Sequence, residues 1–118
     1  MPPARWVSTD TPGVGSNFGQ RVDCCSWARR VWTSGAGPWT RPSTTAYQNF
    51  NGTSSASAII AGVAVLVQAL QAGAGRSRLS STALRTAFRD AGTGTPAAPG
   101  AQIGAMPDLA LVAKHLEV

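Results

Sequence analysis

The chain has 118 residues, which is enough for one small domain. Charged residues make up 13% of it and apolar residues 43%, a balance that is uncommon in a free-standing small domain and suits a section of a larger core. The net charge of +5 comes from residues scattered along the sequence, which argues against a dense nucleic-acid-binding patch.

Residues 1–50 predict short strands separated by turns. Residues 6–9, 20–27 and 30–34 have strand character, whereas 10–13 and 16–19 contain turn-forming residues. Residues 35–50 are expected to form a loop, and a loop of that length is either functional or disordered. The apolar core of a signal peptide is not visible in residues 1–6. The compartment therefore stays open.

Two adjacent cysteines, Cys24 and Cys25, follow Asp23. Neighbouring side chains on a strand point to opposite faces, and a disulfide between them would be strained, so we expect buried free thiols. A structural zinc site needs four ligands, which two adjacent cysteines cannot supply. No cluster of carboxylates indicates a calcium site, and no cofactor is expected. Asp23 is expected to cap a turn.

A helix is predicted within residues 50–67. Asn51 and Gly52 form turns readily. The hydroxyl of Thr53 or Ser54 can then cap the first helical turn. The second half of the stretch has no polar side chain, and a helix that is apolar all round is buried; its ten or so residues fall short of the roughly 20 that a bilayer requires. At the start of such a helix, the dipole and the free amides would stabilise an oxyanion beside a serine.

The elements after this helix are predicted from their own signals. The sequence Gly-Ala-Gly at 73–75 is expected to end the helix. Residues 80–91 form an amphipathic helix that Ser80 or Ser81 caps. A short strand or a turn is expected at 103–107, followed by a terminal helix over 107–116 that begins at Pro107.

The residues around Ser54 carry a resemblance to a known family. Residues 52–57, Gly-Thr-Ser-Ser-Ala-Ser, precede Ala-Gly at 61–62 and an aliphatic run, and this pattern resembles the active-serine motif of the subtilisin-like serine proteases, the subtilase family. Ser54 stands at the nucleophile position. Ala58 replaces the usual Pro, and Ile59 stands where His is frequent, as in one branch of bacterial subtilases.

The resemblance extends, with less specific motifs, over roughly residues 8–116. Residues 16–23 and 31–34 are similar in order and distance to the segments that precede the active serine in this family. The helix, second helix, glycine-containing strand and last helix also follow in the family's order. The resemblance implies an α/β fold. The chain would be the carboxyl-terminal part of a three-layer domain with a mainly parallel sheet and a buried central helix that starts at Ser54.

The resemblance also implies a function and a set of site residues. The chain would belong to a serine endopeptidase and supply Ser54 as the nucleophile, with the Ser54 amide in the oxyanion hole. Asn51, Gly52 and Thr53 would support the motif, although Asn51 is also a simple turn former. The only histidine, His115, follows the serine, whereas the family's Asp, His and oxyanion-hole Asn would all fall before residue 1.

Residues 1–118 are therefore expected to form a single segment that lacks the amino-terminal part of the catalytic domain. Alone, it should be inactive and poorly folded or aggregated. Its expected partners are that missing part and a protein or peptide substrate, with no nucleic acid and no membrane. Some family members bind calcium and many are secreted, but no ligands or leader identify either property here. The alternatives are a non-catalytic subtilase-like interaction module and, less favoured, a basic nucleic-acid-binding module.

Overall fold

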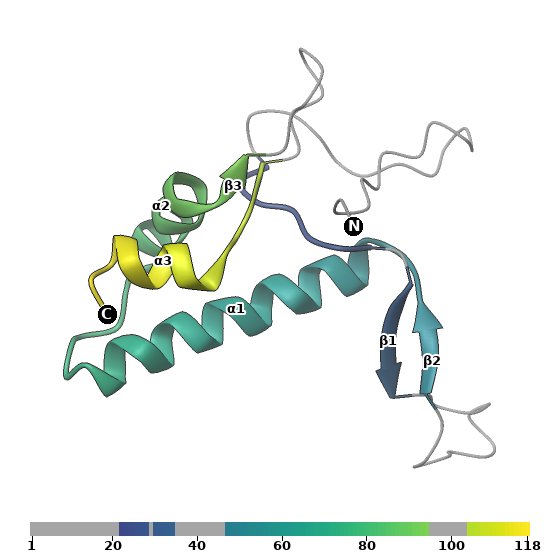
Figure 1. Ribbon diagram of the computed structural model, residues 1–118, viewed down its shortest axis with the longest axis horizontal. Coiled ribbons are helices and arrows are strands. Elements are labelled where there is room, and N and C mark those ends of the chain that lie inside the picture. Colours follow the sequence, from purple (N-terminus) through teal and green to yellow (C-terminus); the bar gives the residue numbers. More distant parts are fainter. Residues whose placement is uncertain (1–21, 29, 35–46, 95–103) are drawn as a thin grey trace.

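A computed structural model describes residues 22–28, 30–34, 47–94 and 104–118. The elements follow in the order β1 (Val31–Ser34), β2 (Tyr47–Phe50), α1 (Thr53–Gly73), α2 (Ser81–Ala91), β3 (Thr93–Gly94), β4 (Ala105–Met106) and α3 (Leu109–His115). The β1–β2 hairpin lies at the amino end of α1, and α2 and α3 lie beside the rest of that helix (Figure 1). The expectations for 6–9, 10–13, 16–19 and most of 35–50 fall outside the described residues.

Helix α1 is 21 residues long and begins at Thr53, so Ser54 is its second residue. Its N-cap is Gly52, and no side chain caps it, so the prediction that Thr53 or Ser54 is the cap is wrong. The carboxyl end is as predicted: the helix ends at Gly73, and Gly75 takes a left-handed φ of 70°.

The expectation that α1 is buried is wrong for this chain. Only Ser55, Val67 and Gln71 of its residues are buried, whereas the Val65 side chain is 68% exposed. By length and composition alone, α1 could cross a membrane, although the core helix of a soluble protein passes the same test. The full extent of the helix was underestimated from sequence, because the apolar run is only its middle.

The core lies where α2 and α3 pack against the second half of α1. It consists of four buried residues: Val67, Ala87, Phe88 and Val112. The amphipathic pattern predicted for α2 is confirmed, since its buried residues Ala87 and Phe88 both face this core. Ser80 caps α2 by accepting a hydrogen bond from the amide of Ala83 at 3.1 Å.

Side-chain hydrogen bonds also connect the loop after α1 to α1 itself and to the residues that follow α3. The Gln68 amide group both donates to the Leu79 carbonyl at 2.9 Å and accepts from the Leu79 amide at 3.0 Å. Arg76 donates to the carbonyl oxygens of Leu116 at 2.6 Å and Glu117 at 3.1 Å, beyond the end of α3. A cation is favourable there because the carboxyl end of a helix carries partial negative charge.

Helix α3 begins later than predicted. Its N-cap is Asp108, whose carboxylate accepts from the amides of Ala110 at 2.9 Å and Leu111 at 3.2 Å, so the helix does not begin at Pro107. The carboxylate provides the capping interaction, since it satisfies two first-turn amides that otherwise have no partner.

The strands form two small antiparallel sheets. β1 pairs with β2, and β3 pairs with β4. In the part of the chain that the structure describes, the single parallel pairing is an isolated bridge between Cys24 and Ala105. The chain combines helices with strands, as an α/β chain does, but the mainly parallel sheet is not confirmed. The strand predicted at 20–27 is reduced to that bridge within 22–28, while β2 occupies the end of the expected loop.

Candidate functional site

Ser54 lies at the end of α1 that faces the hairpin. Its side chain is exposed, and it follows the exposed Thr53 in the first helical turn. First-turn amides have no partners inside the helix, and the helix dipole adds partial positive charge at that end. No acidic residue in the first turn of α1 cancels this charge. The position therefore favours negative charge on or beside the serine oxygen.

The turn before Ser54 is held to the segment that leads into β1. The amide of Gly52 donates to the Ala28 carbonyl at 2.7 Å. The Asn51 side chain accepts from the Arg30 amide at 2.8 Å. Gly52 has a φ of 123°, a conformation that side-chain-bearing residues rarely adopt. Asn51 is thus more than a turn former, since its side-chain oxygen joins this turn to the segment that leads into β1.

The neighbouring serines differ from Ser54 in their surroundings. The Ser55 side chain is only 6% exposed, and its hydroxyl donates to the Gly52 carbonyl at 2.7 Å. This bond uses the hydroxyl to close the turn. Ser57 is exposed on the same helix. Ser54 thus combines an exposed hydroxyl with a position in the first turn.

An open groove of about 450 Å³ lies between the hairpin and the first turns of α1. Its apolar walls come from both sides: Val31, Trp32, Phe50, Ala58 and Ile59. Three hydroxyl-bearing residues complete the lining: Thr33, Ser54 and Ser55. None of these side chains is ionisable at neutral pH. The groove can therefore accept apolar groups beside the serine, but no side chain of its lining can act as a general base.

His115 lies far from Ser54. It is exposed at the end of α3, three residues beyond Val112, which packs against Val67 in the core. At 1.5 Å per residue, Val67 is about 20 Å along α1 from Ser54. The expectation that His115 does not act as the base is consistent with this separation.

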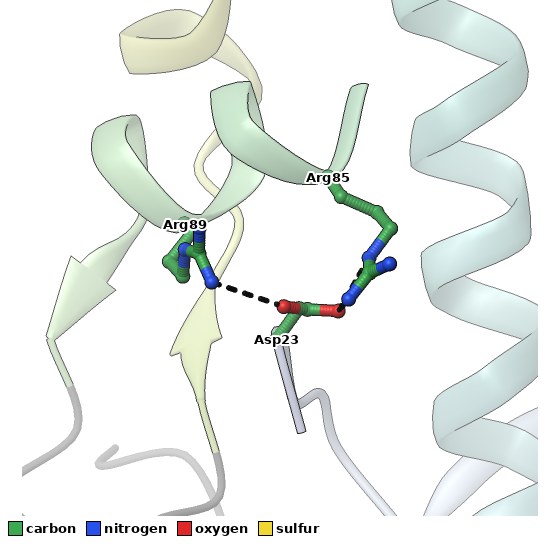
Figure 2. A network of polar contacts seen from close by, with 3 residues as sticks. All are labelled: Asp23, Arg85 and Arg89. Atoms are coloured by element: carbon green, nitrogen blue, oxygen red, sulfur yellow. Dashed lines mark hydrogen bonds and ion pairs between the residues drawn. The ribbon is translucent and has the colours of Figure 1, made fainter. Parts of the chain in front are cut away.

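Asp23 holds an ion pair and does not face the groove. Its carboxylate lies 2.6 Å from Arg85 and 3.4 Å from Arg89, both on α2 (Figure 2). The hydrogen bond from Arg85 is the main cause that holds the pKa of Asp23 below its ordinary value, and partial burial opposes it. The prediction that Asp23 caps a turn is wrong, because its carboxylate connects residues 22–28 to α2.

Cys24 and Cys25 are both half-buried thiols. Cys24 packs against the core, and burial raises the pKa of its thiol. Cys25 contacts the Gly104 carbonyl, 3.8 Å from its sulfur atom. Gly104 is required there: its φ is 77°, and a Cβ atom would lie 2.4 Å from the Asp23 carbonyl carbon. Within the described ranges, no three His, Cys, Asp or Glu side chains gather as metal ligands would.

The four consecutive residues Asn51, Gly52, Thr53 and Ser54 thus form the turn at the start of α1, and of these four Ser54 lines the groove. Sequence reasoning missed the contribution of Trp32 and Phe50, which it treated as parts of a strand and a loop. In residues 47–50 the available signal was the pair of aromatic residues, Tyr47 and Phe50, because aromatic residues are enriched in strands.

Comparison with known families gives one match. The model of the subtilase family, a family of serine-type peptidases, matches residues 15–105, which is more than half of the chain. No curated protein matches the sequence.

Proposed function

Because the chain belongs to the subtilase family, we propose that it supplies the nucleophile of a serine endopeptidase and that this nucleophile is Ser54. The observation that carries the proposal is the position of the exposed Ser54 hydroxyl, in the first turn of a 21-residue helix and at the edge of an apolar groove. The matched region includes this turn.

In the proposed reaction, Ser54 Oγ attacks the carbonyl carbon of a peptide bond while its proton passes to a base. The Ser54 amide and the helix dipole stabilise the oxyanion of the tetrahedral intermediate. Protonation of the leaving amine breaks the C–N bond and leaves an acyl ester on Ser54, which water then hydrolyses. Gly52 and Asn51 act as positioning residues, since they fix the turn that carries the serine.

We further propose that the base, its Asp and the second oxyanion donor come from outside residues 1–118, from the amino-terminal part of the catalytic domain. The groove lining contains no imidazole or carboxylate, and His115 is remote, so the described residues give Ser54 no base. The chain alone is then inactive, because an unactivated serine hydroxyl is a weak nucleophile.

The exposed face of α1 also supports a contact with the amino-terminal part of the catalytic domain. Several of its residues are apolar or small and exposed: Ala58, Ala61, Gly62, Val65, Leu66 and Ala69. Large exposed apolar patches usually mark contacts with other protein surfaces. We expect the amino-terminal part of the domain to cover this face. Uncovered, it should make the isolated chain associate, which light scattering of the purified protein would measure; a monomer with a sharp cooperative melt would contradict this.

Complementation tests the proposed function. The purified chain would be mixed with an amino-terminal subtilase portion that carries the triad Asp and His and the oxyanion-hole Asn, and hydrolysis of a fluorogenic peptide would be followed. We expect activity only in the mixture. Ser54→Ala should lower the rate by several orders of magnitude, whereas the matched control Ser57→Ala should retain it. Unchanged activity of the Ser54→Ala mixture would contradict the assignment of the nucleophile.

The non-catalytic alternative predicts a different result in the same assay. An interaction module would bind the amino-terminal portion but would give no hydrolysis, even with both Ser54 and Ser57 intact. Hydrolysis by the chain alone that Ser54→Ala abolishes would contradict the claim that the base lies elsewhere.

A further inference from the structure

A short segment, residues 23–28, links the turn that carries Ser54 to helix α2, and we call it the connector. In Figure 1 it runs in dark blue from beside β3 toward the start of β1. We propose that Asp23, at the far end of the connector, is a positioning residue for Ser54, because its ion pair with α2 fixes the segment that holds the nucleophile turn. This inference rests on the proposed function, and it adds a residue that lies outside the groove lining.

The connector reaches the nucleophile turn at Ala28. The Ala28 carbonyl accepts a hydrogen bond from the amide of Gly52, two residues before Ser54, at 2.7 Å. Beyond the connector, the amide of Arg30 donates to the Asn51 side chain at 2.8 Å. Arg30 has a φ of 53°, a conformation that a non-glycine residue keeps only where its surroundings impose it. Ala28 is 1% exposed, so its carbonyl holds the turn from a buried position.

The other end of the connector is held by an ion pair and by backbone hydrogen bonds. Asp23 Oδ2 accepts from Arg85 Nε at 2.7 Å, and Asp23 Oδ1 lies 3.4 Å from Arg89 Nη1 (Figure 2). The Asp23 carbonyl accepts from the Ala105 amide at 3.1 Å, and the Cys25 amide donates to the Ala105 carbonyl at 2.9 Å. The Asp23 side chain is only 14% exposed, which shields its carboxylate from water. The connector is therefore fixed at both ends.

Helix α2 is in turn fixed to the helix that carries the nucleophile. Phe88 of α2 and Val67 of α1 belong to the same buried core. The path from Ser54 along α1, through the core into α2 and back along the connector therefore closes at Gly52. Without the ion pair, the backbone bonds to Ala105 remain. Loss of the Asp23 charge should therefore loosen the nucleophile turn rather than dismantle it.

The expected effect on catalysis is moderate. The Arg85 and Arg89 side chains are 63% and 58% exposed, so water and salt weaken their attraction to Asp23. A shift of about 1 Å in a reacting group can nevertheless cost about a hundredfold in rate. We expect Asp23→Asn to lower kcat about three- to tenfold and to leave KM within about twofold, because none of the three residues lines the groove.

Hydrogen exchange tests the connector without any reaction. The chain would be mixed with the amino-terminal subtilase portion, and exchange of the Gly52 amide would be followed by mass spectrometry at single-residue resolution. Asp23→Asn should speed this exchange about threefold or more, because the bond from Gly52 to Ala28 opens more often. The control Asp90→Asn, an exposed change on α2, should leave it unchanged. Unchanged Gly52 exchange in Asp23→Asn would overturn the inference.

Steady-state kinetics of the same mixture, with the amino-terminal portion at saturation, tests the link to catalysis. Asp23→Asn should lower kcat and not raise KM, and Asp23→Glu, which keeps the charge, should recover most of the loss. Arg85→Gln breaks the pair from the side of α2, so it serves where Asp23→Asn does not fold. The double variant should be no slower than either single variant, because both remove the same pair. Additive losses, a raised KM with unchanged kcat, or no loss would contradict the role of Asp23.

The proposed function and this inference fail in different ways. If hydrolysis by the mixture does not require Ser54, the proposed function is wrong, and Gly52 exchange still decides whether the connector holds the turn. If hydrolysis requires Ser54 but neither Gly52 exchange nor kcat responds to Asp23→Asn, the inference alone is wrong.

Discussion

The two ends of α1 lie in different surroundings. The second half packs against α2 and α3, with Val67 fully buried and Gln68 bound to the next loop. The first half carries Ser54 beside a two-stranded hairpin and leaves most of its surface exposed. The described residues therefore contain the packing that fixes the axis of the helix, but not the packing that would surround the end that carries Ser54.

Truncation of one phenylalanine beside each half of α1 should show the largest difference between the two halves. Phe88 is 3% exposed in the core, and Phe50 is 42% exposed on β2. Phe88→Ala should lower the opening free energy of α2 and α3 by about 3–5 kcal/mol. Phe50→Ala should have a smaller effect, because its ring is already partly hydrated. Hydrogen exchange read by mass spectrometry measures both, and similar losses of protection would contradict the comparison.

Two valines within α1, one buried and one exposed, test the same difference more closely. Val67 is fully buried, whereas Val65, two residues earlier, is 68% exposed. Val67→Ala removes two buried methyl groups and should cost about 2 kcal/mol in the amide opening free energy of the second half of α1. Val65→Ala should cost close to nothing. If Val65→Ala proves as costly, an unseen contact covers that face in the isolated chain.

A glycine pair tests how residues 22–28 are joined to the helical region. Gly104 and Gly75 both have left-handed φ angles, of 77° and 70°. Alanine at Gly75 meets no atom within 4 Å, so it should cost only the strain of about 1–2 kcal/mol. Gly104→Ala adds a clash with the Asp23 backbone and should expose residues 22–28 to proteolysis. Equal protease sensitivity of the two variants would argue against this close approach.

The smallest expected effect is the pH dependence of the Asp23 ion pair. The Arg85 hydrogen bond, followed by the charges of Arg85 and Arg89, lowers the folded-state pKa of Asp23. The stabilisation is thus present above the unfolded-state value of about 4 and is lost as pH falls through the lower folded-state value. Asp23→Asn should destabilise the chain slightly at pH 7, and the difference should shrink as the pH is lowered through the folded-state pKa of Asp23.

Thermal melts of the chain mixed with the amino-terminal subtilase portion, at pH 7 and at a series of lower pH values, measure this change, and Asp90→Asn, an exposed change on α2, is the control. A difference between Asp23→Asn and the unchanged chain that does not shrink as the pH falls would show that the ion pair is not its cause. The effect should also weaken with added salt, because both arginines are mostly exposed.

The sequence predicted the parts of the fold that depend on local signals. The amphipathic face of α2, the Ser80 cap and the glycine end of α1 follow from spacing and backbone preference within a few residues. The motif around Ser54 also indicated the family, which the match over residues 15–105 confirms.

Features that depend on distant contacts were not predictable in this way. Asp23 meets Arg85 and Arg89 across more than 60 positions, so no local pattern reveals the pair. The apolar run of α1 predicted burial, but burial depends on what surrounds a helix, and the described residues cover mainly its second half. The groove likewise arises where β1, β2 and α1 meet, which single-sequence patterns do not place.

Covalent labelling of the complemented enzyme tests the central claim most directly. A fluorophosphonate would be added to the chain together with the amino-terminal subtilase portion, and the adduct would be located by peptide mass spectrometry. We predict one adduct, on Ser54, that disappears in Ser54→Ala and persists in Ser57→Ala. An adduct on Ser55 or Ser57, or labelling that survives Ser54→Ala, would contradict the assignment of Ser54 as the nucleophile.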